Sequence, residues 1–225
     1  MILFLIFFLF VFVLPKFWLS NAMKKNDEEL MNMPFTAEEF GQIILKENNL
    51  SDVKIEETEQ VDHYDLHDKT VRVQQGRLAK KSLTSLTIIC HEIGHAIQHK
   101  EEYGPLVRRT SLVERTQWIS KFGGVILYSG LPLILATGSF GLIKVCLLLV
   151  LISVLLGVFI HLITLDVEID ASFNRAMPIL EEKIPIEYHS QCKNVLQAAA
   201  YTYVIGALTS FLSLRYIWLL LSRVR

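Results

Sequence analysis

The stretch His91-Glu92-Ile93-Gly94-His95 decides how this chain is interpreted. Residues four apart on a helix lie on one face, so His91 and His95 can bind the same metal ion. The glutamate between them can reach a water molecule on that metal, which is the arrangement of the H-E-x-x-H motif of zinc hydrolases. We therefore expect a motif helix over residues 83–99, with Glu92 as the general base.

A zinc site of this kind needs a third protein ligand. In the gluzincin arrangement that ligand is a glutamate on a later helix, and Glu168 is the candidate. Its neighbours Asp166 and Asp170 stay open as alternatives, because helical spacing alone does not exclude them. The expected centre is one zinc ion held by His91, His95 and Glu168.

Composition separates the chain into charged and uncharged blocks. Of its 225 residues 52% are hydrophobic, and most charges lie in residues 24–121 and 166–193. We predict a mainly α integral membrane protein, with about four transmembrane helices and a small α+β zincin-like domain of gluzincin type at the membrane surface. The expected parts are an N-terminal transmembrane anchor (1–20), the zincin-like domain (21–121), a transmembrane helical hairpin (122–165), a third-ligand helix and surface segment (166–193) and a C-terminal transmembrane helix (194–221).

The first apolar run, residues 2–14, is short for a span: thirteen residues of helix cover about 20 Å of a hydrocarbon core of about 30 Å. Continuing through Leu19 supplies the length if Lys16 reaches the interface. The rival interpretation is a signal peptide cleaved near Ser20-Asn21-Ala22. An uncleaved anchor is favoured, because the lysines follow the apolar run instead of preceding it.

The uncharged blocks 122–143, 145–165 and 194–214 each have the length of a membrane span. Pro132 is expected to kink the first, and residues 138–141 to make the turn to the second. Crossing the membrane twice would return the chain to the side it left, which would put Glu168 on the motif's side of the membrane, near its surface.

Lysine and arginine are concentrated on the motif's side of these expected spans. The positive-inside tendency then predicts a multi-pass protein of the cell membrane with its active site in the cytoplasm. The basic C-terminal end, with Arg223 and Arg225, speaks mildly against this orientation.

Within the expected domain, residues 23–33 are polar and indicate a linker. Thr36 and Glu39 have capping-box spacing, and Phe35 and Phe40 can form a hydrophobic staple, so a helix is expected from there to about residue 48.

Strands are expected at 53–55 and 70–73, where apolar and polar residues alternate. We expect them to pair antiparallel across a charged turn at 61–69. The edge of strand 70–73 is a candidate site for an extended substrate, and an ordinary sheet strand is an equal alternative.

Gly94 and several other residues carry weaker signals. A glycine inside a helix costs about 1 kcal/mol against alanine, so something is expected to pack closely against Gly94. Three scattered cysteines indicate no disulfide framework, and Cys90 is expected in the core. Of the other histidines, His99 is expected on the surface. A second metal at His63 and His67 is disfavoured in a strand or turn. His161, inside an expected span, is either functional or bonded to a neighbouring helix.

These residues resemble the bacterial membrane-bound neutral zinc metallopeptidases of the YugP-like family. The resemblance rests on these segments: the N-terminal apolar run, Asp62-His63-Tyr64-Asp65 with Lys69, residues 91–99, Tyr103-Gly104-Pro105-Leu106, Glu168-Ile169-Asp170-Ala171-Ser172 with Arg175-Ala176, and residues 198–204. It implies a zinc-dependent, membrane-embedded peptidase with His91 and His95 as ligands and Glu92 as the catalytic glutamate, and it supports Glu168 as the third ligand.

A more distant similarity is to the HtpX and CAAX-protease group, whose pattern has an aspartate after the alanine. Here Ser172 stands at that position. Asp170 is the candidate to orient a histidine in its place.

The function expected from the sequence is a membrane-anchored zinc endopeptidase. A non-catalytic zinc-binding assembly or chaperone-like membrane protein is the alternative, and a zinc enzyme acting on a small non-peptide bond is a third. Expected partners are a peptide or protein substrate, including membrane proteins, and the lipid bilayer; a net charge of −1 and the lack of a motif argue against nucleic acid. Tyr64, Tyr188 and His189 are candidates by residue type for stabilising an oxyanion.

Overall fold

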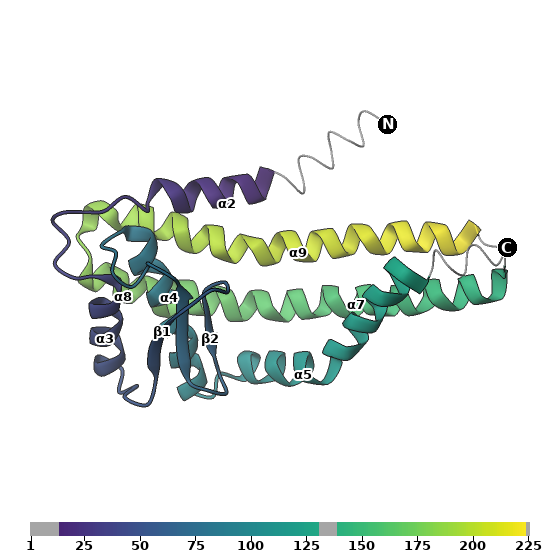
Figure 1. Ribbon diagram of the computed structural model, residues 1–225, viewed down its shortest axis with the longest axis horizontal. Helices are drawn as coiled ribbons and strands as arrows, with labels where there is room; N and C mark the ends of the chain where they lie inside the picture. Colours follow the sequence, from purple (N-terminus) through teal and green to yellow (C-terminus); the bar gives the residue numbers. More distant parts are fainter. Residues whose placement is uncertain (1–13, 131–138, 224–225) are drawn as a thin grey trace. The chain divides into compact units, whose positions relative to one another are not determined.

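Figure 1 shows the computed structural model, which describes residues 14–130 and 139–223. The chain forms two compact units, one of Met1–Val107 with Asp166–Thr202 and the other of Arg108–Leu165 with Tyr203–Arg225. The expected anchor is described only from Leu14 onward. The expected kink at Pro132 and the first residue of the expected turn at 138–141 lie outside the described residues.

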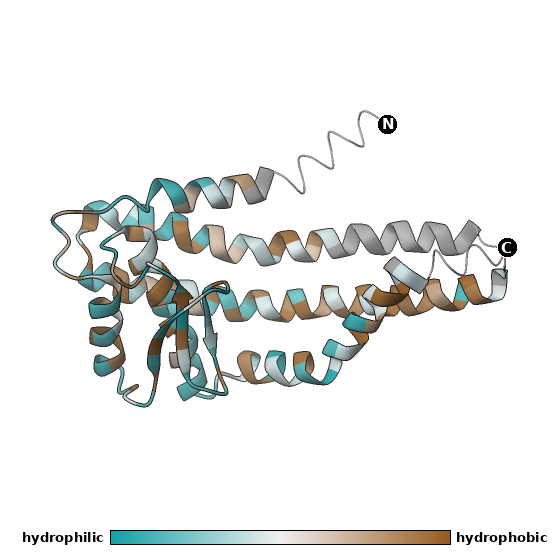
Figure 2. Cartoon of the chain, viewed as in Figure 1, coloured by the Kyte–Doolittle hydropathy of each residue, from teal (hydrophilic) through white to brown (hydrophobic). Residues whose placement is uncertain are grey.

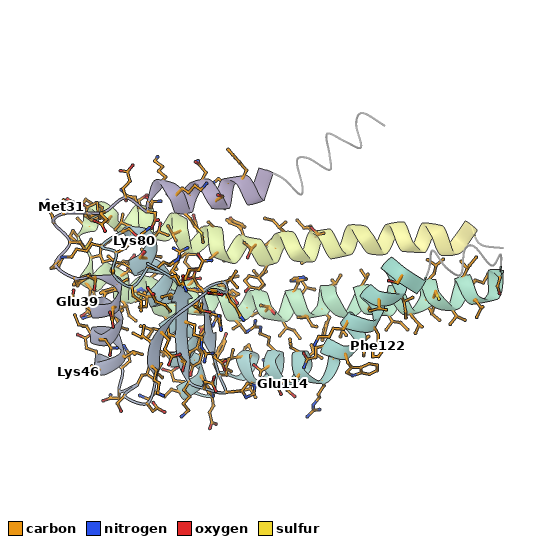
Figure 3. The ribbon with its side chains drawn as sticks, viewed as in Figure 1. Met31, Glu39, Lys46, Lys80, Glu114 and Phe122 are labelled. Atoms are coloured by element: carbon orange, nitrogen blue, oxygen red, sulfur yellow. The ribbon has the colours of Figure 1, made fainter. Side chains whose placement is uncertain are left out.

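Helix α3 (Ala37–Glu47) begins where the sequence predicts. The Thr36 side chain accepts a hydrogen bond from the Glu39 backbone N–H at 3.2 Å, and the Glu39 carboxylate accepts one from the Thr36 N–H at 2.7 Å. The rings of Phe35 and Phe40 stack 4.7 Å apart, which confirms the staple. Phe40 is fully buried, whereas Glu39 and Lys46 lie on the outer side of the helix (Figure 3).

The sheet has the order β1-β3-β2, with β1 (Lys54–Thr58), β2 (His63–Asp65) and β3 (Thr70–Gln74). β1 and β3 are parallel, so the expected antiparallel pairing of these two segments is wrong. The expected charged turn contains β2, which pairs antiparallel with β3 and reverses the chain between them. Only Tyr64 of β2 is buried, and this single apolar position is too short a pattern to predict a strand.

The central position of β3 also removes the candidate substrate edge at residues 70–73. Both sides of β3 are hydrogen-bonded, to β1 on one side and to β2 on the other. A further polypeptide can therefore be added only at β1 or β2.

Helix α4 (Leu83–Lys100) is the core of the first unit. Ser82 caps it by accepting a hydrogen bond from the Ser85 N–H at 3.2 Å, and every residue from Leu83 to Gln98 is buried. Cys90 is 0% exposed, as predicted. A helix buried on all sides needs neighbours all round, and α3, β2, β3 and the segment after α7 supply them.

The segment after α2 (Leu14–Lys25) is fixed to the start of α4, although the sequence indicated a linker there. The Thr84 N–H donates to the Asn26 carbonyl at 3.0 Å, and the Lys80 ammonium lies 2.6 Å from the Asp27 carboxylate. Residues 23–33 therefore belong to the folded unit in part.

Helix α7 (Phe140–Ile169) runs directly into a π-helical segment, η3 (Asp170–Ala176). Then follow α8 (Met177–Lys183), the 3₁₀ turn η4 (Ile186–Tyr188) and α9 (His189–Arg223). η3 packs on α4 at Gly94, where an added Cβ would lie 2.8 Å from the Ala171 carbonyl oxygen. This confirms the close packing expected at Gly94.

The second unit contains most of α5 (Gly104–Val125), the π-helical turn η2 (Ile126–Gly130), most of α7 and the end of α9. The Ser153 hydroxyl of α7 donates to the Ile119 carbonyl of α5 at 3.2 Å. Gly206 of α9 lies against the His161 ring, where a Cβ would come within 2.7 Å of Cε1. His161 thus packs against a neighbouring helix, and the two roles expected for it stay predictions.

The predicted fold class is contradicted. Over the described ranges the chain is mostly helical with one small sheet, and one helical stretch, Gly141–Lys183, is long and apolar enough to cross a membrane by length and composition. Figure 2 shows hydrophobic residues along α7. About four transmembrane helices are not found there. The prediction counted blocks without charge, whereas this finding rests on mean hydropathy along a described helix, and residues 1–13 and 131–138 of two expected spans lie outside the described part of the chain.

Gly94→Ala tests the contact between α4 and η3. The added methyl group meets backbone, which cannot move aside as a side chain can, so we expect the free energy of unfolding to fall by about 1–3 kcal/mol. Chemical denaturation followed by circular dichroism measures it. Gly124→Ala in α5 is the control, because a Cβ there meets nothing within 4 Å. Equal stability of the two variants would contradict the described packing.

Candidate metal centre

Three buried side chains of the first unit converge at the end of α7. His91 and His95 project from α4, and Glu168 comes from the last turn of α7; their exposed fractions are 8%, 8% and 3%. The Glu168 carboxylate oxygen Oε2 lies 3.2 Å from His91 Nε2 and 3.5 Å from His95 Nε2. One ligand atom from each residue lies within 4.8 Å of the other two.

This donor set fits a zinc ion. Zinc binds imidazole nitrogen and carboxylate oxygen at about 2.0–2.2 Å in tetrahedral geometry, which separates neighbouring ligand atoms by about 3.4 Å. The two distances to Glu168 are close to that separation. Of the three acidic residues considered as third ligand, the structure brings Glu168 to the histidines. Asp166 is exposed, and the Asp170 carboxylate is bound by other side chains.

Each imidazole is oriented by a hydrogen bond at its other nitrogen. His91 Nδ1 lies 3.1 Å from the Ser172 hydroxyl, and His95 Nδ1 lies 2.9 Å from the Gln98 side-chain oxygen. Both rings therefore turn Nε2 toward Glu168, at an interplanar angle of 80°. Metal-binding histidines are commonly held in this way.

Asp170 does not contact a histidine of the centre directly, as the aspartate expected in place of Ser172 would. Its carboxylate accepts a hydrogen bond from the Gln98 amide at 2.8 Å, and Ser172 itself reaches His91. Sequence reasoning missed Gln98. Its position three residues after His95, on the same side of α4, was the feature of the sequence that could have indicated a contact with that histidine.

Burial sets the ionisation of the glutamate inside the motif. Glu92 is 6% exposed, and desolvation raises the pKa of its carboxyl group against the attraction of His91 and His95. The negative charges of Glu168 and Asp62 raise it further. A carboxylate with a raised pKa is suited to accept and return a proton near neutral pH.

Glu168 and His95 form a charged pair without a metal. Burial favours the neutral form of each, but the attraction between them outweighs it. It holds the pKa of Glu168 well below its usual range and raises the pKa of His95 to about 9.

The remaining candidates lie elsewhere. The Tyr64 hydroxyl is 2.9 Å from His99 Nδ1, so His99 is half-buried beside β2 instead of free on the surface. His189 Nε2 bonds the Ile184 carbonyl at 2.8 Å. The oxyanion role suggested for Tyr64, Tyr188 and His189 stays a prediction.

The pair His63 and His67 does not join any metal-binding group among the described residues. His63 is the first residue of β2, and its Nδ1 lies 2.8 Å from the Val61 carbonyl oxygen. His67 lies in the turn that follows β2.

Comparison with known proteins identifies the family. A family model described as "Putative neutral zinc metallopeptidase" matches residues 1–222. The chain belongs to this family. This metallopeptidase family member is also 33% identical, over 215 residues, to "Putative membrane protease YugP" of Bacillus subtilis (strain 168), with 92% of each chain covered. No solved structure matches the chain. The resemblance inferred from the motifs is confirmed, and the His91, His95 and Glu168 cluster fits the zinc of this family.

The Asp170 carboxylate predicts a pH dependence for the metal-free protein. Burial would raise its pKa, but hydrogen bonds from Arg175, Gln98 and Asn174 lower it from the usual 3.8. A carboxyl group whose pKa is lower in the folded than in the unfolded protein stabilises the fold. This stabilisation is complete at pH values above the pKa of Asp170 in the unfolded protein, and it is lost as the pH falls through the pKa of Asp170 in the folded protein. Asp170→Asn should therefore lower the unfolding free energy at pH 6 and have progressively less effect below pH 3.8. Denaturation curves across this range measure the difference; an effect that is constant with pH would contradict the described pairing.

Proposed function

We propose that the protein is a zinc-dependent endopeptidase of gluzincin type, with one zinc ion held by His91, His95 and Glu168. The observation that carries the proposal is the buried Glu168 carboxylate, 3.2 and 3.5 Å from the two imidazole nitrogens. Membership of a zinc metallopeptidase family supports it.

Glu92 is proposed as the general base. A bound zinc ion supplies Lewis acidity, lowering the pKa of water to about 7 and polarising the peptide carbonyl. Glu92 lies between the two histidines on α4 and is buried, so its carboxylate can take a proton from the attacking water and later give it to the leaving amine.

An open metal position favours catalysis over a structural role. Structural zinc sites have four protein ligands, whereas catalytic sites have three and leave one position for water. In the described part of the chain, the cluster contains three residues able to bind a metal. The alternative of a non-catalytic assembly or chaperone-like protein is less well supported for this reason.

The outer edge of β2 is the proposed binding site for an extended substrate. β2 is an edge strand beside the motif helix, and its Tyr64 is bonded to His99 of α4. Peptides commonly add to such an edge through backbone hydrogen bonds.

Membrane association is proposed from the long apolar stretch in α7 and from the relative named as a membrane protease. Membrane proteins are then natural candidates for the substrate. We place the site on the cytoplasmic side because basic residues follow the motif helix closely: Arg108, Arg109, Arg115 and Lys121.

Two substitutions test the chemistry. Glu92→Gln should keep one equivalent of zinc and lose peptide cleavage by about 10²-fold or more, because the amide cannot accept the proton. Glu168→Ala should lose most of the zinc. Metal analysis and cleavage of an unfolded protein measure both, with the exposed Glu187→Gln as the control. Cleavage at the wild-type rate by Glu92→Gln would refute the mechanism.

A protease-cleavable tag inserted in the Glu101–Tyr103 turn tests the orientation. We expect the tag to be protected in intact spheroplasts and cut in inverted membrane vesicles. The reverse pattern, with the tag cut in spheroplasts and protected in inverted vesicles, would place the site outside the cytoplasm. Recovery of the tagged protein in the soluble fraction alone would refute membrane association.

A further inference from the structure

Gln98 is a fully buried amide with every polar group of its side chain bonded. It is 0% exposed and lies in the last turn of α4, three residues after His95. Its oxygen faces His95 Nδ1 at 2.9 Å. Its nitrogen donates to the Val167 carbonyl at 2.9 Å and to the Asp170 carboxylate at 2.8 Å.

These partners fix the orientation of the amide. A backbone carbonyl and a carboxylate only accept hydrogen bonds, so together they use both hydrogens of the Gln98 nitrogen. Asp170 is itself held by Arg175, whose Nε lies 2.6 Å from the same carboxylate oxygen. The amide oxygen is left to face His95, and it can only accept.

The orientation of Gln98 in turn fixes the tautomer of His95. An acceptor at Nδ1 requires that Nδ1 carry the proton. The lone pair of the neutral ring is then on Nε2, which is the atom turned toward Glu168. A metal ligand needs this tautomer.

The same amide joins the two helices that supply the ligands. Val167 directly precedes Glu168 in the chain, whereas His95 is on α4. The bond from Gln98 to the Val167 carbonyl therefore links the backbone that carries the third ligand to the helix that carries the other two. Packing of η3 against Gly94 brings η3 and α4 together. The hydrogen bonds of Gln98, unlike this packing, fix the orientation of the side chains that they join.

We propose that Gln98 is a positioning residue for the metal centre: it sets the tautomer of His95 and the spacing between His95 and Glu168, and thereby the affinity for zinc. The proposal rests on the proposed function in one respect, that this cluster binds zinc. It does not depend on peptide cleavage.

Gln98→Leu tests this role in the full-length purified protein, since leucine fills the site without hydrogen bonds. Zinc affinity is measured by competition with a chelator of known affinity, and we expect it to fall about 10–100-fold. The visible spectrum of the cobalt-substituted protein should change as well, because it reports ligand geometry. Thr87→Val is the matched control, a buried polar-to-apolar change in the same helix.

Gln98→Met is the second variant, because an unbranched apolar chain adapts to the site if leucine does not fold there. Zinc affinity within about twofold of Thr87→Val, or weaker binding with an unchanged cobalt spectrum, would overturn the proposal. A wild-type protein that binds no zinc would instead overturn the proposed function, so the two failures are distinguishable.

Discussion

The site depends on one buried carboxylate. Glu168 is 3% exposed, and a buried charge without a partner costs several kcal/mol. Two imidazoles face it, and the negative charge of Glu168 raises the pKa of His95 to about 9 against the effect of burial.

The sequence predicted the parts of this arrangement that local rules govern. The capping box at Thr36, the motif helix and the close packing at Gly94 each follow from a few neighbouring residues, and the structure has all three. Glu168 could be selected only by analogy, because Asp166 and Asp170 have similar spacing. What separates them is the surroundings of each carboxylate: Glu168 meets His91 and His95, more than seventy residues earlier in the chain, whereas Asp170 is bound by Gln98 and Arg175 and Asp166 is exposed.

Two of the failures come from long-range geometry. β2 has one buried residue and is formed by pairing with β3, so no local pattern indicates it or the parallel direction of β1. Gln98 looks like an ordinary polar position near a helix end until Val167 and Asp170 are seen beside it. The expected transmembrane helices are a separate case: they rested on the lack of charge along the sequence, and residues 1–13 and 131–138 of them lie outside the described part of the chain. Only the stretch from Gly141 passes the stricter test of hydropathy along one described helix.

X-ray absorption at the zinc edge tests the central claim most directly. The purified, zinc-loaded protein should show two imidazole nitrogens and at least one carboxylate oxygen at about 2.0–2.2 Å, with the imidazole signal halved in His95→Ala and the fold retained. Sulfur in the first coordination shell, or a spectrum that His95→Ala and Glu168→Ala leave unchanged, would show that zinc binds elsewhere and would contradict the account.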